Sequence, residues 1–333
     1  MHLPLPIRIL LLPLSWIYGA VIRTKTALYA SGAISQKRLN GAVVSVGNLT
    51  VGGTGKTPMV LWLAENFLAE GKRVAILSRG YRGEQGTSDE VELLKLRLGG
   101  RVRFGVGPDR FAEGRKLESA EPVDVFLLDD GFQHLKLARD VDIVMLDGLK
   151  KLKDEWLLPA GNLREPIRAC RRADLLVVTR KFERPPIEAN DAHEHQLFYA
   201  QTRLLGFRKL GEQGTPRFLS EIGTGPYFAF CGIGNPQGFF DDLKRWHVMA
   251  AGTREFRDHH HYTQSDANEL QVLAKNVGAT ALVTTEKDEQ NLRGANFAQL
   301  PVYVAAIDFV LSSENEFNLA LNRILGERRS RVA

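Results

Sequence analysis

Cysteine is scarce in this chain, and acidic residues are missing from its N-terminal region. Only Cys170 and Cys231 occur in 333 residues, and they lie far apart. Two such cysteines exclude a disulfide framework and a cysteine-rich zinc site, and they suit a reducing compartment. No aspartate or glutamate precedes Glu65, although the net charge of the whole chain is only +5. A mild total charge of this kind does not by itself identify a partner.

The apolar run near the N-terminus is shorter than the roughly 20 residues of a membrane-spanning helix. It reads "ILLLPLSWIYGAVI", residues 9–22, and contains Pro13. The small-residue pattern of a signal-peptide cleavage site is poor. Trp16, Tyr18 and the basic flanks predict instead a helix in the membrane interface. The flanking residues are Arg8, Arg23, Lys25, Lys37 and Arg38. A buried core helix and a spanning or cleaved segment are the alternatives.

A glycine-rich stretch follows the first strong strand signal. The segment "GAVVSVGN", residues 41–48, predicts a buried strand, and "TPMVLWLAENFLAEG", residues 57–71, predicts a helix ended by glycine. Strand, glycine-rich turn and helix form the context of a P-loop, where backbone N–H groups and the helix N-terminus bind phosphate. The predicted nucleotide-binding residues are Thr50, Val51, Gly52, Gly53, Thr54, Gly55, Lys56 and Thr57.

Each residue type in this loop suits a part of phosphate binding. The three glycines allow the backbone to approach phosphate oxygens closely. Lys56 would reach the β- and γ-phosphates of ATP, and the hydroxyl of Thr57 would ligate Mg²⁺. The usual pattern G-x-x-x-x-G-K-[ST] has glycine where this chain has Thr50. An ordinary strand-to-helix turn is the alternative reading of the stretch.

A carboxylate partner for the P-loop comes from "VFLLDDG", residues 125–131. Asp129 ends an apolar strand and Asp130 follows it directly. Because the carboxyl ends of strands in an open α/β sheet face the ligand crevice, both aspartates are predicted Mg²⁺ ligands together with Thr57. One of the two could instead cap a turn. Val51 stands where the deviant partition-type ATPases carry a lysine, which disfavours that class.

Short apolar runs and helix-length segments alternate along the chain. This alternation predicts a parallel sheet with helices on both faces, of the P-loop NTPase kind. A second strand–turn–helix series after the ribbon-like segment "HQLFYAQTRLLGF" predicts a second, smaller α/β domain. The predicted parts are an N-terminal interfacial helix region at 1–35, a P-loop kinase domain at 36–195, a β-ribbon linker at 196–225 and the second domain at 226–330.

Seven motifs in this order closely resemble the tetraacyldisaccharide 4′-kinase family, from the apolar N-terminus to about residue 310. They are "SVGNLTVGGTGKTP", "LSRGY", "LLDDGFQH", "PAGNLREP", "GIGNP", "DHHHYT" and "TTEKD". The resemblance implies transfer of the γ-phosphate of ATP, with Mg²⁺, to the 4′-hydroxyl of an acylated glucosamine disaccharide 1-phosphate lipid, giving lipid IVA. It also implies two α/β/α domains joined by a ribbon, on the cytoplasmic face of the inner membrane. The family's P-loop has the form seen here at Thr50.

The resemblance also implies the catalytic residues. Asp89 and Glu90 match the family's Asp-Glu motif, with Asp89 as the base, although Ser88 stands where the family typically has glycine. His259, the first of three consecutive histidines, is implied as the partner of Asp89. Lys56 of the P-loop is the third predicted catalytic residue, on the P-loop context itself. Successive side chains share no face of a helix or strand, so the histidines do not predict a mononuclear metal site. Asp89 is assigned to the first domain and His259 to the second.

The lipid acceptor agrees with the rest of the sequence. Burying acyl chains is worth about 0.8 kcal/mol per CH₂, so an enzyme acting on such a lipid has to work at the bilayer surface. The 1-phosphate suits the basic N-terminal region, and Arg79, Arg82 and Arg164 are further predicted contacts for anionic groups of the substrate. Ordinary solvation at the surface is the alternative for each arginine.

The sequence therefore predicts a membrane-surface sugar-lipid kinase. We expect it to be a monomer, peripheral or monotopic on the inner membrane, with no nucleic acid as partner. A P-loop ATPase switch or metallochaperone acting on a protein partner is the alternative from another class. Val51 and the interfacial helix argue against that alternative.

Overall fold

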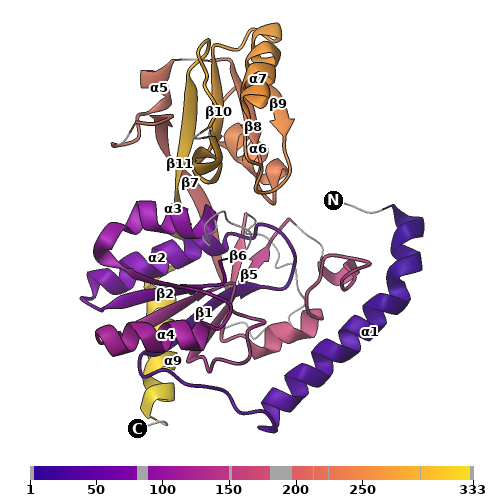
Figure 1. Ribbon diagram of the computed structural model, residues 1–333, viewed down its shortest axis with the longest axis vertical. Helices are drawn as coiled ribbons and strands as arrows, with labels where there is room; N and C mark the ends of the chain where they lie inside the picture. The colour runs from indigo at the N-terminus through magenta and orange to yellow at the C-terminus, as the bar shows by residue number, and fades with distance from the viewer. Residues whose placement is uncertain are drawn as a thin grey trace. The chain divides into compact units, whose positions relative to one another are not determined.

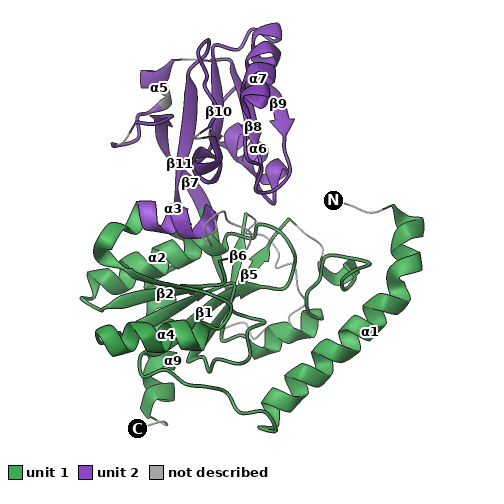
Figure 2. Ribbon diagram, viewed as in Figure 1, with its two compact units in different colours: residues 1–82, 97–201, 310–333 green, residues 83–96, 202–309 purple. Residues whose placement is uncertain are grey.

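The chain forms two compact units in a computed structural model that describes residues 4–80, 89–149, 152–180, 197–212, 214–223, 225–292 and 294–330. Figure 2 shows the first unit, residues 1–82, 97–201 and 310–333, and the second, residues 83–96 and 202–309. The segment 83–96 thus groups with the second unit although it precedes most of the first in sequence. Residues 310–333 group with the first unit. The predicted boundaries place residues 83–96 in the P-loop domain and residues 310–330 in the second domain. The contact division therefore assigns both segments differently.

The first unit is built on a parallel sheet with the strand order β3-β2-β4-β1-β5-β6, and the start of β7 pairs with β6. All residues of β1, β2, β4, β5 and β6 are buried, which is typical of parallel strands covered on both faces. The strands are β1 (Ala42–Asn48), β2 (Val74–Ser78), β3 (Arg103–Val106), β4 (Val125–Asp129), β5 (Val141–Asp147), β6 (Leu175–Thr179) and β7 (Leu197–Lys209).

Helices cover both faces of this sheet (Figure 1). On one face, Phe111 and Leu117 of α4 (Arg110–Ala120) pack against a cluster that includes Leu77 and Phe126. On the other lies α2 (Lys56–Ala69), whose Trp62 makes an edge-to-face contact with Phe317 of α9 (Glu314–Ser330) at 5.5 Å between ring centroids. The predicted α/β sheet with helices on both sides is confirmed. Short 3₁₀ segments lie at Gly99–Arg101, Leu152–Asp154 and Ile167–Arg172.

The N-terminal helix α1 (Leu5–Ala30) is longer than the predicted apolar run at 9–22, and Pro13 lies inside it. Among the described residues it is the one helix long and apolar enough to cross a membrane. Its buried residues are Ser15 and Gly19, whereas Leu10 is 78% exposed and Trp16 is 69% exposed. The helix therefore buries small residues and exposes large apolar ones, which argues against the alternative of a core helix.

Helix α1 docks on the first unit through its small and polar side. Ser15 Oγ donates to the carbonyl of Leu157 at 3.0 Å, and the hydroxyl of Tyr18 donates to the carbonyl of Arg164 at 2.9 Å. A Cβ atom at Gly19 would lie only 2.7 Å from Cδ1 of Leu157, so a larger residue there would have to displace that side chain. These contacts explain which side of the helix faces the protein.

The second unit has strands in the order β7-β11-β10-β8-β9, of which β11, β10, β8 and β9 are parallel. Strands β7 and β11 run antiparallel, because the N–H of Leu210 donates to the carbonyl of Val302 and the N–H of Ser312 to the carbonyl of Tyr199. Its strands are β8 (Tyr227–Cys231), β9 (Ala250–Glu255), β10 (Ala281–Thr285) and β11 (Val302–Leu311). Alternate residues of β8 face different helices: Ala229 and Cys231 pack with α6 (Pro236–Arg245), and Phe228 and Phe230 pack with α7 (Gln264–Asn276). The remaining helices are α3 (Asp89–Leu98), α5 (Leu219–Ile222), α8 (Glu286–Glu289) and the 3₁₀ turn Gln290–Leu292. Strands β7 and β11 each have residues in both units.

Two strands lack the apolar run on which the sequence prediction depended. Strand β3 reads "RFGV" and β9 reads "AAGTRE", and both lie at an end of the strand order. Most of β9 is exposed. An edge strand buries little side-chain surface, so its sequence carries a weak signal.

Candidate active site

The glycine-rich loop leads from β1 into α2. Gly52 and Gly55 have φ angles of 107° and 86°, and Gly55 caps the N-terminus of α2. The amide of Asn48 donates to the carbonyl of Gly52 at 3.3 Å and to Oγ1 of Thr54 at 3.0 Å. The hydroxyl of Thr179 donates to the carbonyl of Thr54 at 3.4 Å. The carboxyl ends of β1 and β6 therefore hold the loop in its conformation.

Thr50 lies at the start of this loop and is held there by strand-like pairing. It is buried and forms an isolated antiparallel bridge with Leu163. The N–H of Val51 donates to the carbonyl of Asn162 at 2.8 Å. A β-branched residue favours such pairing. The geometry thus accounts for threonine at a position where the usual P-loop pattern has glycine.

Two aspartates lie at the end of β4 beside the loop. Asp129 is buried, and Asp130 has a positive φ of 50°. Oδ1 of Asp130 lies 3.5 Å from Nζ of Lys56, and Nη1 of Arg164 donates to both of its oxygens at 2.9 and 2.7 Å. Burial raises the pKa of Asp130, but the charges of Lys56 and Arg164 lower it more, so the pKa is below its usual range. Asp130 is therefore ionised at neutral pH.

The residues around the loop suit a magnesium ion in an ATP complex. Mg²⁺ prefers hard oxygen ligands and is usually held by one or two carboxylates together with substrate phosphates. Thr57 at the start of α2 offers a hydroxyl, and Asp129 and Asp130 offer carboxylates. The described residues contain no cluster of three or more His, Cys, Asp or Glu side chains suited to a metal. A site completed by phosphate oxygens does not need such a cluster.

Arg110 and His134 form a polar pair whose charge acts on Asp130, and the sequence analysis assigned no role to either residue. Arg110 is 6% exposed, and its Nη1 lies 3.2 Å from Nδ1 of His134. Because a guanidinium can only donate, Nδ1 is the acceptor and the imidazole proton sits on Nε2. Burial and the Arg110 charge lower the pKa of His134 to about 4, so the ring is neutral. His134 lies in the quoted motif "LLDDGFQH", which was the available signal.

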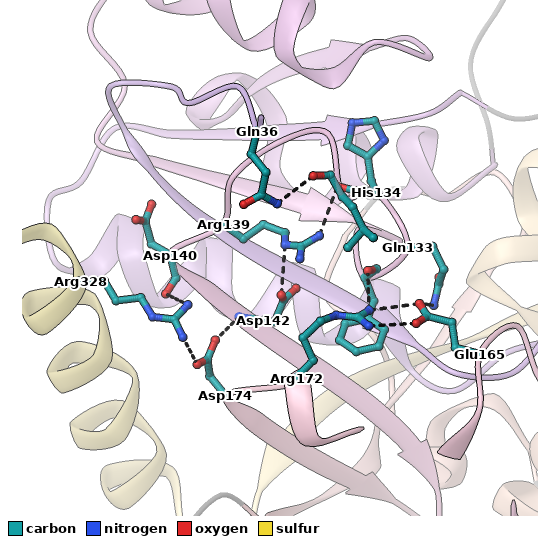
Figure 3. Close-up of polar contacts among 12 residues, drawn as sticks. Gln36, Gln133, His134, Arg139, Asp140, Asp142, Glu165, Arg172, Asp174 and Arg328 are labelled. Carbon is teal, nitrogen blue, oxygen red and sulfur yellow. Dashed lines mark hydrogen bonds and ion pairs between the residues drawn. The ribbon is translucent and has the colours of Figure 1, made fainter. Parts of the chain in front are cut away.

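A buried polar network supports the loop from the side of β5 and β6. Figure 3 shows Arg172 reaching the carboxylate of Glu165, with distances of 3.0 and 3.1 Å to its two oxygens. The amide of Gln133 donates to Oε1 of the same glutamate at 3.1 Å and to the carbonyl of Asn48 at 3.0 Å. Asn48 in turn holds the P-loop. The network therefore extends from Arg172 to the predicted phosphate site.

The structure brings Asp89 and His259 together in the second unit. Nδ1 of His259 lies 2.9 Å from Oδ2 of Asp89, and Nδ2 of Asn291 donates to the same oxygen at 2.8 Å. Asp89 begins α3. The assignment of Asp89 to the first domain differs from the contact division, in which residues 83–96 belong to the second unit (Figure 2). The assignment followed chain order, whereas the division follows spatial contacts.

The electrostatics of this pair favour a charged state for both members. The hydrogen bond to Asp89 raises the pKa of His259 above its usual value. Burial raises the pKa of Asp89, but the hydrogen bonds from His259 and Asn291 lower it more, so its pKa falls below the usual range. Lys287 lies beside the pair, with Nζ 2.8 Å from Oε1 of Glu90. At neutral pH Asp89 is a carboxylate beside a histidine that retains its proton readily.

The backbone at His259 is held by a buried aspartate. His259 has a positive φ of 61°, and its N–H donates to the carbonyl of Gly232 at 3.0 Å. Asp288, 1% exposed, accepts from the N–H of Gly232 at 2.8 Å, from Tyr262 at 2.9 Å and from Thr285 at 2.6 Å. The motifs "GIGNP", "DHHHYT" and "TTEKD" thus meet at one carboxylate. The sequence alone gave no reason for this convergence.

The remaining histidines and the predicted substrate-binding arginines lie outside the Asp89–His259 pair. His260 stacks on Phe256 and its Nε2 lies 3.2 Å from Asp266, while His261 is exposed. The three histidines therefore point to different surroundings. Arg79 is exposed after the end of β2, and Arg82 lies outside the described residues.

Comparisons with known proteins find similar sequences and a similar structure over nearly the whole length of this chain. The family model described as tetraacyldisaccharide-1-P 4′-kinase matches residues 7–326. The tetraacyldisaccharide 4′-kinase of Geobacter metallireducens is 36% identical over 95% of this chain and 98% of that protein. The one of Geobacter sulfurreducens is 37% identical over 93% of this chain and 91% of that protein. The crystal structure of LpxK from Aquifex aeolicus in complex with ATP has a TM-score of 0.75 and 31% identity, covering 96% of this chain and 99% of that chain.

Proposed function

The chain belongs to the tetraacyldisaccharide-1-P 4′-kinase family, and from this membership we propose how its residues act. It is a phosphotransferase that uses ATP to phosphorylate the 4′-hydroxyl of tetraacyldisaccharide 1-phosphate, a step of lipid A biosynthesis that yields lipid IVA. The observation that carries this conclusion is the family match across residues 7–326. A P-loop ATPase switch acting on a protein is not favoured, because the relatives named above are kinases.

The donor nucleotide binds at the glycine-rich loop in this proposal. The backbone N–H groups from Gly52 to Thr57 and the N-terminus of α2 surround the phosphates. Lys56 places its charge on the β- and γ-phosphates. In the described geometry Lys56 faces Asp130 at 3.5 Å, so this lysine already lies at the carboxyl end of β4.

Thr57 with Asp129 or Asp130 would hold Mg²⁺. When bound, the ion neutralises the developing charge on the β- and γ-phosphate oxygens. Asp130 is held ionised by Lys56 and Arg164. We further propose that Arg164 binds anionic groups of the substrate along with Arg79 and Arg82.

Asp89 is the general base in this proposal. Its carboxylate accepts the proton of the 4′-hydroxyl as the hydroxyl oxygen forms a bond to the γ-phosphorus. The bond from that phosphorus to the β–γ bridging oxygen breaks, and ADP leaves with that electron pair. His259 orients Asp89 through the 2.9 Å hydrogen bond and takes part in the proton transfer.

Helix α1 places the enzyme at its lipid substrate. We propose that its exposed apolar side enters the cytoplasmic face of the inner membrane while Ser15 and Tyr18 keep it docked on the first unit. The helix is therefore monotopic in this proposal. We propose that the enzyme acts as a monomer and without a nucleic-acid partner.

The decisive experiment supplies purified protein with ATP, Mg²⁺ and the disaccharide 1-phosphate lipid in detergent. Mass spectrometry should detect a lipid that has gained one phosphate, with one ADP formed per product. The Lys56→Ala protein is the control and should form almost none. Release of inorganic phosphate without phosphorylated lipid would contradict the kinase function and favour the switch.

A further inference from the structure

Asn291 occupies a specific position beside the proposed base. Its Nδ2 donates to Oδ2 of Asp89 at 2.8 Å, and Nδ1 of His259 lies 2.9 Å from that same oxygen. Among the described residues, both hydrogen bonds of the Asp89 side chain therefore reach Oδ2. Because an ionised carboxylate can only accept, the amide must present its NH₂ group to Asp89.

We propose that Asn291 is a positioning residue that fixes the carboxylate of Asp89 with Oδ1 turned to the acceptor hydroxyl. One hydrogen bond leaves a carboxylate free to rotate about its terminal torsion, which has a broad energy profile. Two donors converging on one oxygen restrict that rotation and reserve the other oxygen for the substrate. This inference rests on the proposed function of Asp89 as the base.

The position of Asn291 is itself tightly held. The residue is 9% exposed and lies in the 3₁₀ turn Gln290–Leu292, directly after α8. Its carbonyl accepts from the N–H of Tyr262 at 3.1 Å. The capping hydroxyl of Thr285 fixes the start of α8 through Asp288. The contact with Tyr262 uses the backbone of Asn291, so its side-chain amide remains available for Asp89.

A neutral amide suits the charge balance of the site. Asp89 is surrounded by His259, Lys287 and Glu90, and Asp258 lies 3.7 Å from Nε2 of His259. An amide stabilises the ionised carboxylate without adding a group that titrates or competes with His259. A further cation here would weaken the base more strongly, whereas a further carboxylate would repel it. The type of residue at position 291 therefore matters as well as its place.

The test compares two substitutions of Asn291 in the full-length enzyme with ATP, Mg²⁺ and the lipid acceptor. Asn291→Leu keeps the branched outline of the side chain and removes the donor. We expect kcat to fall about 10- to 100-fold, with the KM for ATP changed less than about twofold. The acid limb of the plot of kcat against pH should shift to higher pH by roughly one unit. The pKa of Asp89 rises because its carboxylate loses a stabilising donor. Asn291→Asp keeps the shape and should move the limb further.

Controls separate this role from a merely structural one and from failure of the base assignment. Asn268→Leu, on the surface of α7, makes the same chemical change and should leave the pH profile unaltered. An Asn291→Leu profile that superimposes on the wild type would overturn the positioning role. If that variant does not fold, Asn291→Ala, which also lacks the donor and adds no charge, decides by the same limb. Full activity in Asp89→Asn would overturn the base and, with it, the inference, whereas an inactive Asp89→Asn with normal Asn291 variants overturns the inference alone.

Discussion

His259 and Asp89 are 170 residues apart in sequence and meet through a 2.9 Å hydrogen bond inside the second unit. The pair has its own scaffold: α3 carries the carboxylate, and the turn after β9, tied to Gly232, carries the imidazole. Both residues are therefore positioned by one unit.

The pair should act as one catalytic element. Asp89→Asn and His259→Asn are each expected to lower kcat by roughly 10²- to 10⁴-fold, and the double variant should be little worse than the poorer single variant. Asparagine is chosen at position 259 because it tolerates the positive φ of 61° found there. Steady-state kinetics on all three proteins measures the effect. Losses that multiply in the double variant would show independent roles.

Stability should depend on pH through the same pair. The pKa of His259 is raised, so its contribution is complete below the usual imidazole value near 6.5 and is lost as pH rises through the raised pKa. The pKa of Asp89 is lowered, so its contribution exists above the usual carboxyl value and is lost as pH falls through the lowered pKa. Urea unfolding of wild type and His259→Asn should differ by on the order of 1 kcal/mol near pH 6 and by less at pH 9. A difference that grows with pH would contradict the assigned shift.

Lys56 should matter for phosphate transfer and not for folding. Lys56→Ala is expected to lose most kinase activity, because the γ-phosphate loses its charge partner, while thermal unfolding stays close to wild type. Lys72→Ala, an exposed lysine just after α2, is the matched control. Turnover of product per enzyme is the measurement. Near wild-type turnover of Lys56→Ala would remove this lysine from the mechanism.

Gly55 and Gly71 offer a comparison of two glycines with similar positive φ. A Cβ at Gly55 would lie 3.3 Å from Cγ2 of Thr179, whereas a Cβ at Gly71 meets nothing within 4 Å. Alanine at either site should cost about 1–2 kcal/mol of stability through backbone strain. Only Gly55→Ala should also lose ATP affinity, measured by calorimetry, because the strain lies in the phosphate loop. Equal ATP affinity in both variants would argue against phosphate binding there.

Helix α1 should bind lipid through its exposed side. Replacing Leu10, Trp16 and Ile17 together by serine is expected to abolish flotation with anionic phospholipid vesicles, while ATP binding and thermal unfolding remain near wild type. Deleting residues 1–22 should also reduce membrane association with the nucleotide site intact. Aggregation or failed folding of the serine variant would show that these side chains pack inside the protein.

The predicted elements and the observed ones agree best where burial is complete. Strands β1 and β4 were predicted from the apolar segments at 41–48 and 125–131, because parallel strands covered on both faces must be apolar throughout. Strands β3 and β9 were not predicted, because edge strands bury too little to require apolar residues. Helix α1 exceeds its apolar run at both ends, where Arg8 donates to the carbonyl of Ala160 and Lys25 donates to the carbonyl of Gln133.

Local sequence determined the strand–turn–helix context of the P-loop, the aspartates after β4 and the apolar helix, because each depends on neighbours in the chain. Tertiary structure alone decided that residues 83–96 group with the second unit, that Asn291 and His259 share one oxygen of Asp89, and that Asp288 joins three motifs. It also placed Arg110 against His134. Such contacts depend on how distant segments pack, and a hydrogen bond between residues 170 or 202 positions apart leaves no periodic pattern in one sequence.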